Sequence, residues 1–229
     1  MNYSAYLLDI EGTVCPISFV QDVLFPYFTA QVPHLHESIN PNIIDILSKF
    51  EIEDNNELTR HILDLVSRDV KDPLLKQLQG YVWAQGYETG EIKAPVYPDA
   101  VDLIKRHEGR VYIYSSGSVK AQKLLFGHVQ GPDGETMDLL PYIYGYFDIN
   151  TSGKKTDAQS YINILRDIKI VGKFDSDQLA GNILFLSDNP LELDAAKEAG
   201  FSTGLAIRPG NGPVLDVSKY SQYTDYSEL

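Results

Sequence analysis

Two acidic residues follow directly on an apolar run near the start of the chain. The run Ala5–Leu8 precedes Asp9 and Glu11, which are separated by one residue and followed by Gly12. Carboxylates at the end of a strand can form covalent intermediates, transfer protons or bind a hard cation. They can equally be a helix N-cap and a solvated turn residue. The pair therefore marks a candidate site without defining one.

Other polar segments lie at the ends of later predicted strands or just ahead of a predicted helix. They are Ser115-Ser116-Gly117-Ser118, Gly153-Lys154-Lys155, and Ser187-Asp188-Asn189 with Glu192 and Asp194 further on. In open parallel sheets, ligands bind outside the carboxyl ends of the strands, so these groups are expected to converge. Each segment alone has an ordinary interpretation as an N-cap, a turn or a solvated surface. The ordered combination is much more specific.

The elements that would position these groups alternate between strands and helices. Apolar runs that suit strands buried on both faces occupy residues 5–8, 110–114, 182–186 and 203–207. Helical patterns lie between them, and Asn189-Pro190 and Gly200 have the order of residues that starts and ends a helix. This alternation predicts an α/β fold with a doubly wound parallel sheet.

The section after the first strand has a different pattern. It lacks strand-like runs and carries apolar stripes at helical spacing, formed by Ile43, Ile46, Leu47 and Phe50, by Leu58, Ile62, Leu65 and Val66, and by Leu74, Leu78 and Val82. We expect residues 15–94 to form an all-helical inserted domain, and residues 1–14 and 95–229 to form the α/β core. Pro95 and Pro98 mark the return to that core.

Composition excludes several classes of protein. Lys and Arg total 19 against 32 Asp and Glu, and the net charge of −13 argues against a nucleic-acid surface. The single cysteine, Cys15, excludes an intramolecular disulfide and fits a reducing compartment; we expect a packing role for it, although a reactive thiol is conceivable. No signal peptide or membrane span is expected. We expect a monomer without membrane partners in the cytoplasm, with diffusion into the nucleus left open.

The order of the polar segments resembles the haloacid-dehalogenase-like (HAD) hydrolase superfamily. Its four motifs correspond to Asp9-Ile10-Glu11-Gly12-Thr13, to Ser115, to a lysine ahead of a helix, and to Asp188. The resemblance implies a Rossmann-like, HAD-type core, and the helical insertion falls where this superfamily places a cap domain.

Longer stretches narrow the resemblance to one family. DIEGTVCPISFVQDVLFPY, LLKQLQGYVW, VYIYSSGSVKAQKLLFGH, FLSDNPLELDAA and IRPGN are similar to the enolase-phosphatases of the methionine salvage pathway, also called acireductone synthases. In that family Glu replaces the usual second Asp of the first motif. The resemblance covers nearly all of the chain.

This resemblance implies roles for the motif residues. Asp9 would be the nucleophile that forms an aspartyl-phosphate, and one Mg²⁺ per chain would be bound by Asp9, Asp188 and the backbone carbonyl of Glu11. Ser115 and the N–H groups of Ser116 and Gly117 would hold phosphoryl oxygens at a helix N-terminus. A lysine would supply positive charge. Lys155 is preferred over Lys154 because it completes the Gly-x-Lys pattern of the family.

Glu11 is the general acid–base candidate, and the base for enolisation is left open. The implied reaction is enolisation and then dephosphorylation of 5-methylthio-2,3-dioxopentyl phosphate, a small-molecule substrate. The alternatives are a HAD-type phosphatase for another small metabolite and a non-catalytic binding module. The presence of all four motif residues disfavours the binding module, and the lack of G-x-G-x-x-G after the first strand disfavours a dinucleotide domain.

The insertion is expected to decide substrate identity. Gln79, Trp83 and Lys93 could face the substrate there, and Phe19, Phe25 and Tyr27 could form an apolar pocket for the methylthio tail. All six have an equally good interpretation as packing or solvated residues. The five histidines lack a spacing that indicates a paired metal site, so we expect no catalytic role for them.

Overall fold

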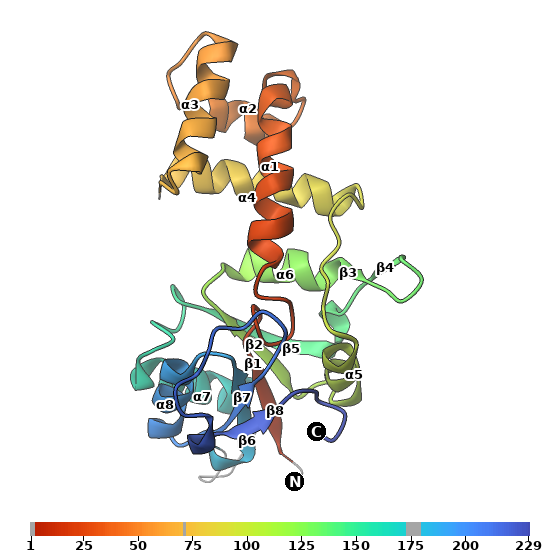
Figure 1. Ribbon diagram of the computed structural model, residues 1–229, viewed down its shortest axis with the longest axis vertical. Coiled ribbons are helices and arrows are strands. Elements are labelled where there is room, and N and C mark those ends of the chain that lie inside the picture. Colours follow the sequence, from red (N-terminus) through yellow and green to blue (C-terminus); the bar gives the residue numbers. More distant parts are fainter. Residues whose placement is uncertain (1–2, 71, 173–179) are drawn as a thin grey trace. The chain divides into compact units, whose positions relative to one another are not determined.

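A computed structural model describes residues 3–70, 72–172 and 180–229 (Figure 1). It divides into two compact units: Met1–Phe19 together with Ala94–Leu229 form unit 1, and Val20–Lys93 form unit 2. Compact units are not the same as domains, so the domain boundaries predicted near residues 15 and 95 stay a prediction. The compact division places its first boundary after Phe19, five residues later than the predicted one after Val14.

Unit 1 is built on a parallel sheet of six strands within the described residues, in the order β5-β2-β1-β6-β7-β8. The strands are β1 (Ala5–Leu8), β2 (Val111–Ser115), β5 (Ile143–Asp148), β6 (Ile183–Ser187), β7 (Ser202–Ala206) and β8 (Ser221–Tyr223). Leu8 at the end of β1 pairs with Ile113 of β2 and Leu186 of β6. The residues after β1 therefore emerge between the ends of β2 and β6. A small antiparallel pair, β3 (Val129–Gln130) and β4 (Thr136–Met137), is separate from this sheet.

Helices cover the sheet of unit 1. They are α5 (Pro98–Arg106), α6 (Val119–Gly127), α7 (Ala158–Gly172) and α8 (Pro190–Glu198), and α5 lies on the opposite side of the sheet from α7 and α8 (Figure 1). Short 3-10 helices are η3 (Leu140–Tyr142), η4 (Ala180–Asn182) and η5 (Val217–Lys219). Tyr161 of α7 is fully buried and makes edge contacts with Tyr114 and Phe185 of the sheet. The predicted doubly wound α/β class is confirmed.

Local sequence signals explain where these elements begin and end. Asn189 caps α8 by accepting from Leu191 N at 3.0 Å, Pro190 occupies the first turn, and Gly200 follows the helix at φ +92°, as predicted. The sequence patterns did not predict β5 or β8. Both are edge strands with mixed or polar outward residues, which breaks the continuous apolar signal of a central strand.

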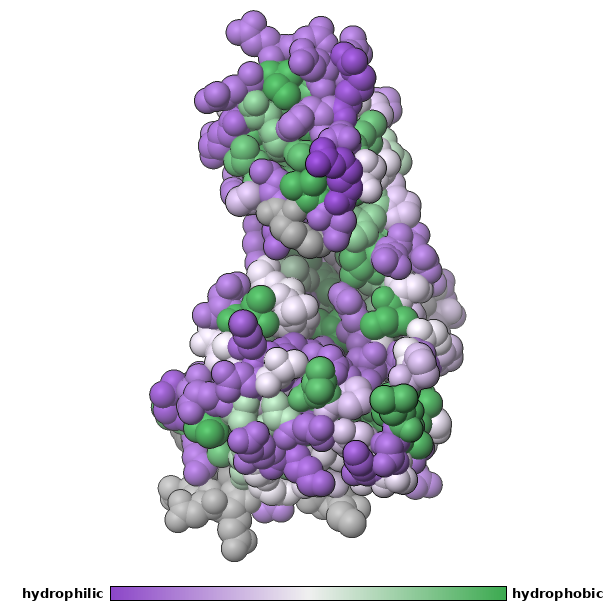
Figure 2. Space-filling view, turned by 60° about the vertical axis from the view of Figure 1, so that its left-hand side comes forward, coloured by the Kyte–Doolittle hydropathy of each residue, from purple (hydrophilic) through white to green (hydrophobic). Residues whose placement is uncertain are grey.

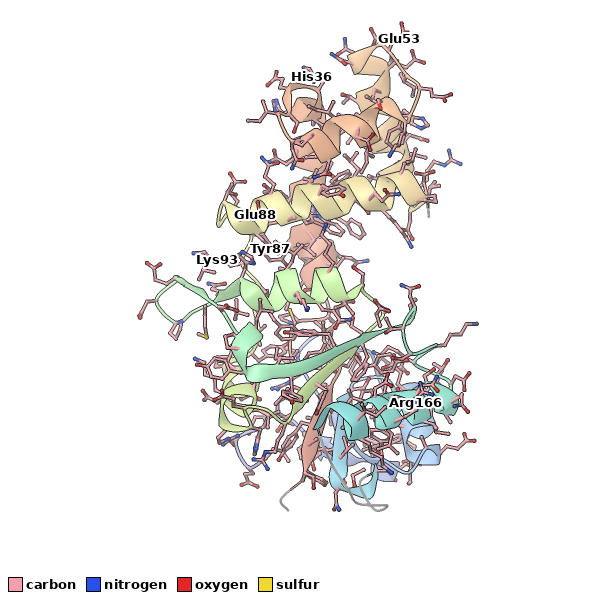
Figure 3. All side chains as sticks on the ribbon, turned by 180° about the vertical axis from the view of Figure 1, so that it is seen from behind. His36, Glu53, Tyr87, Glu88, Lys93 and Arg166 are labelled. Carbon is pink, nitrogen blue, oxygen red and sulfur yellow. The ribbon has the colours of Figure 1, made fainter. Side chains whose placement is uncertain are left out.

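Unit 2 is all-helical in its described part, as predicted for the insertion. It contains η1 (Val20–Leu24, a π-helix), α1 (Phe25–Gln31), η2 (Val32–Glu37), α2 (Pro41–Ser48), α3 (Asn55–Ser67) and α4 (Pro73–Glu88). Side chains of Asn40, Asp54 and Asp72 cap the first turns of α2, α3 and α4. The predicted helical stripes pack into one cluster that includes Ile43, Leu58 and Leu78. Glu53 lies in the α2–α3 connection and Glu88 ends α4 (Figure 3).

Hydrophilic residues cover most of the face shown in Figure 2, with hydrophobic residues in separate small groups. Among the described residues, no helix is long and apolar enough to cross a membrane.

Candidate active site

A pocket of about 360 Å³ in unit 1 lies where β1, β2 and β6 end. Its lining brings together residues from five separate parts of the sequence: Asp9, Glu11, Ile17, Ser115, Ser116, Lys155, Asp188, Asn189, Pro190, Glu192, Gly212, Pro213 and Val214. All but one of the candidate site residues line this pocket. The exception is Gly117, whose N–H donates to Ser115 Oγ at 3.2 Å within the loop.

Lys155 is the buried cation of the pocket. Its Nζ lies 2.5 Å from Asp9 Oδ1 and 2.7 Å from Glu192 Oε2, and all three residues are nearly inaccessible to solvent. Lys154, by contrast, is exposed. The geometry therefore favours Lys155 over Lys154 as the lysine that neutralises the acids.

Two tyrosines fix the segment that carries this lysine. The hydroxyl of Tyr161 donates to the Lys155 carbonyl at 2.8 Å, and the hydroxyl of Tyr114 donates to the Gly153 carbonyl at 2.7 Å. Both rings belong to the core beneath the pocket. Packing of α7 on the sheet thus determines where the Lys155 ammonium lies.

Asp9 is held by groups from three elements. Its Oδ1 accepts from Ile10 N at 2.8 Å as well as contacting Lys155, and its Oδ2 lies 3.1 Å from the Ser187 hydroxyl. The same hydroxyl lies 2.9 Å from Glu192 Oε2, so its one proton serves two carboxylates. These bonds fix the Asp9 carboxylate at the carboxyl end of β1.

The acids of the pocket perturb one another. Burial and the charge of Asp9 raise the pKa of Asp188 to about 6, and they raise the pKa of Glu192 to about 7 against the opposing effect of Lys155. Glu11 is the exposed member, and loss of hydration followed by the charge of Asp9 raises its pKa too. Four carboxylates thus face one ammonium group, which leaves an excess of negative charge that suits a cation.

The loop after β2, residues 116–118, is fixed by hydrogen bonds from α6 and Asp148. Gln122 of α6 is buried, and its Nε2 donates to the carbonyls of Gly117 and Phe147, each at 2.8 Å. Asp148 Oδ2 accepts from Val119 N at 3.1 Å. Burial raises the pKa of Asp148, but backbone N–H donors, including those of Thr151 and Val119, outweigh it and hold the pKa below its usual value. The loop is therefore preorganised at the N-terminus of α6.

Sequence reasoning noted Glu192 and Ser187 but assigned neither a role. Their partners Lys155 and Asp9 are distant in the chain, so only the folded sheet shows the contact. Asn211 and Arg208, in a stretch used only for the family resemblance, contact the loop after Glu11. Cys15 is fully buried, and burial raises the pKa of its thiol, which fits the packing role.

Three of the six residues expected to recognise the substrate have partners within unit 2. Trp83 Nε1 donates to the Leu24 carbonyl at 2.7 Å, and Tyr27 donates to Glu91 Oε2 at 2.6 Å, both within unit 2. Gln79 is buried, Phe25 contacts Trp83, and Phe19 is buried in unit 1. Lys93 ends unit 2 (Figure 3). Ile17, Pro213 and Val214 supply apolar surface in the pocket instead.

Relatives of this chain share its length and most of its sequence. An "Enolase-phosphatase E1" of Saccharomyces cerevisiae (strain RM11-1a) is 63% identical over 233 residues, covering 100% of this chain and 99% of the relative. An "Enolase-phosphatase E1" of Kluyveromyces lactis is 54% identical, covering 100% of both. No protein-family model matches the chain.

Solved structures give the same picture of the fold. The crystal structure of the UTR4 protein of Saccharomyces cerevisiae has a TM-score of 0.90, 61% identity and 100% coverage of both chains. The putative HAD-hydrolase YfnB of Bacillus subtilis, bound to magnesium, has a TM-score of 0.57 at 16% identity, covering 100% of this chain and 97% of its own. The second likeness concerns the fold alone.

The fold is thus that of a HAD-type hydrolase, with its pocket at the carboxyl ends of the parallel strands. Within that class, the chain belongs to the enolase-phosphatase E1 family. The resemblance found in the sequence is confirmed, and the enzyme class is that of a phosphatase.

The two adjacent lysines give a matched test of the pocket. Lys155→Met leaves Asp9 and Glu192 without their cation, and we expect phosphate release to fall about 100-fold or more. Lys154→Met removes an exposed ammonium and is expected to keep near wild-type phosphate release. Steady-state phosphate release with equal amounts of folded protein measures both. Equal losses in the two variants would contradict the assignment.

Proposed function

We propose that this chain enolises and then dephosphorylates 5-methylthio-2,3-dioxopentyl phosphate in methionine salvage. The products are the acireductone 1,2-dihydroxy-5-(methylthio)pent-1-en-3-one and inorganic phosphate. The observation that carries the proposal is the buried Asp9 carboxylate between Lys155 and Ser187, with Glu11 in the same pocket. Family membership supports the two-step reaction.

The donor set of the pocket fits Mg²⁺. In the described part of the chain, no group of three or more His, Cys, Asp or Glu side chains is arranged to hold an ion. The proposed set needs only the carboxylates of Asp9 and Asp188 with the backbone carbonyl of Glu11, all oxygen donors of the kind Mg²⁺ prefers. The raised pKa of Asp188 and the excess of acids over Lys155 support a bound cation. One Mg²⁺ per chain would offset the charge of the substrate phosphate and of the attacking carboxylate.

Phosphoryl transfer would begin at Asp9. Its carboxylate oxygen attacks phosphorus, the bond from phosphorus to the leaving oxygen breaks, and Glu11 donates a proton to that oxygen. The raised pKa of Glu11 favours the protonated form that this step requires. Ser115, the N–H groups of Ser116 and Gly117, and Lys155 would hold the phosphoryl oxygens.

The second half of the reaction restores the enzyme. Water attacks phosphorus of the aspartyl-phosphate, Glu11 accepts the proton of that water, and the bond between phosphorus and Asp9 breaks. Phosphate leaves and Asp9 is again a carboxylate. Glu11 thus handles the proton in both halves, while Asp9 carries the phosphoryl group.

Enolisation would precede these steps and needs removal of a proton from a carbon next to a carbonyl. We propose that the extra methylene of Glu11, compared with the usual Asp, lets one carboxylate reach that proton as well as the leaving oxygen. Its exposed position in the pocket supports this reach.

We also propose a role for unit 2, an oligomeric state and a cellular compartment. Unit 2 would act as a cap domain that selects the substrate, and the enzyme would be a cytoplasmic monomer, with diffusion into the nucleus left open. The net charge of −13 argues against nucleic acid as a partner.

An ultraviolet time course with the diketone phosphate and Mg²⁺, alongside a phosphate assay, tests the two steps. Wild type should show an enol species and then phosphate. Asp9→Asn should release no phosphate, because the amide cannot form the acyl phosphate. Glu11→Asp should slow the appearance of the enol. Phosphate release without an enol species would favour a plain phosphatase for another metabolite, and unchanged enolisation by Glu11→Asp would refute the reach of Glu11.

The acid cluster also predicts how pH and Mg²⁺ affect stability. Because the folded-state pKa values of Asp188 and Glu192 are raised to about 6 and about 7, the folded protein holds protons that the unfolded chain has lost. Without Mg²⁺, the free energy of unfolding should therefore fall between about pH 4 and pH 7.

Saturating Mg²⁺ should reduce this fall, since a cation favours the ionised acids, and should stabilise the protein more at pH 8 than at pH 6. Thermal unfolding with and without chelator measures both effects. Asp188→Asn is the control and should respond weakly to Mg²⁺. An equal Mg²⁺ effect at both pH values would contradict the proposed ligands.

A further inference from the structure

The loop that carries both catalytic acids is held by a segment far along the chain. Gly12, directly after Glu11, has φ +69°, a left-handed conformation that favours glycine. A Cβ there would lie 2.5 Å from Asp188 Oδ2 and 2.8 Å from Asn211 Oδ1. The turn after Glu11 is thus packed directly against Asp188 and Asn211.

Asn211 makes the bond that fixes this turn. Its Nδ2 donates to the Gly12 carbonyl at 2.9 Å and to the Ala206 carbonyl at 3.1 Å, which ties the turn to the end of β7. Because both acceptors are carbonyls, the amide nitrogen must face them, and the orientation of the side chain is determined. Asn211 is outside the predicted site but directly behind it.

Two further hydrogen bonds hold the chain at Thr13, the residue after Gly12. Arg208 Nε and the Tyr226 hydroxyl donate to the Thr13 carbonyl at 3.1 and 3.0 Å. Arg208 is buried, pairs with Asp99 at 2.6 Å and lies against the ring of Tyr226. Asn211 N donates to the carbonyl of this buried arginine at 3.2 Å, which connects Asn211 to the same support.

The two acids differ in what fixes them. Asp9 is held by Ile10 N, Lys155 and Ser187, none of which depends on Asn211. The turn after Glu11 is held by Asn211 at the Gly12 carbonyl, by the N–H of Gly12, which donates to Cys15 O at 2.8 Å, and by the bonds to the Thr13 carbonyl. Loss of the Asn211 amide should therefore let the Glu11 side chain shift, while Asp9 and the Glu11 carbonyl, which shares a peptide unit with the Gly12 N–H bonded to Cys15, stay in place.

We propose that Asn211 is a positioning residue for Glu11, acting through the Gly12 carbonyl. This inference rests on the roles of Asp9 and Glu11 in the proposed function. It assigns each of the two acids its own set of supporting hydrogen bonds. A neutral amide also suits this position, since an acid there would add another negative charge beside Asp188.

An aryl phosphate separates the two acids experimentally. With 4-nitrophenyl phosphate, the leaving nitrophenolate needs no proton, so attack by Asp9 proceeds without Glu11. Phosphorus–oxygen cleavage releases nitrophenolate and leaves the phosphoryl group on Asp9. Release of phosphate then requires Glu11 to take a proton from water.

Asn211→Ala should give a rapid burst of nitrophenolate equal to the enzyme concentration, followed by a steady state about 10- to 100-fold slower than wild type. Its affinity for inorganic phosphate, measured calorimetrically with Mg²⁺, should match wild type. Asn211→Ser, which keeps a donor, should lie between the two. If Asn211→Ala does not fold, Asn211→Ser carries the same comparison.

Ser202→Ala is the matched control. Ser202 Oγ donates to the Gly181 carbonyl at 2.7 Å at the start of the same strand, β7, away from the pocket. It should lose stability without the slow steady state. A wild-type steady state in both Asn211 variants, or loss of the burst together with phosphate affinity, would overturn the proposal. The aryl substrate needs no enolisation, so failure of the proposed function would appear separately, with wild type and the diketone phosphate.

Discussion

The Lys155 ammonium lies between the carboxylates of Asp9 and Glu192 in the buried part of the pocket, and the arrangement of unit 1 depends on this contact. Charges in a protein interior need close partners and hydrogen bonds to offset lost hydration. Lys155 supplies the partner, and Ser187 supplies a hydrogen bond. The loop before α7 must therefore meet the ends of β1 and β6, and the buried Tyr161 beneath it fixes that meeting point.

One lysine does not balance four acids, and that imbalance gives the pocket its chemistry. The acids are unequal because their surroundings differ: Asp9 is bonded from three directions, while Glu11 is exposed and its pKa is raised. A carboxylate fixed by several bonds suits a nucleophile, and one whose raised pKa lets it gain a proton suits an acid–base group. The remaining negative charge is suited to Mg²⁺ and, through it, to a phosphate ester.

Much of this could be predicted from the sequence, for physical reasons. Central strands such as β1 and β6 are buried on both faces and leave continuous apolar runs, while the edge strands β5 and β8 do not. Asp9, Glu11 and Asp188 could be named as candidates because each lies within three residues of the end of such a run. The partnership of Glu192 with Lys155 and the bond from Asn211 to Gly12 join distant parts of the chain, and no local pattern encodes them.

The central claim is that Asp9 takes the phosphoryl group while Glu11 only moves protons. Mass spectrometry of acid-quenched Glu11→Gln enzyme, mixed with Mg²⁺ and 4-nitrophenyl phosphate, tests it most directly. The account predicts one phosphoryl group on the peptide that contains Asp9, accumulating because the second step lacks its base. An unmodified Asp9 peptide after a burst of nitrophenolate, or a phosphoryl group on another residue, would contradict the account.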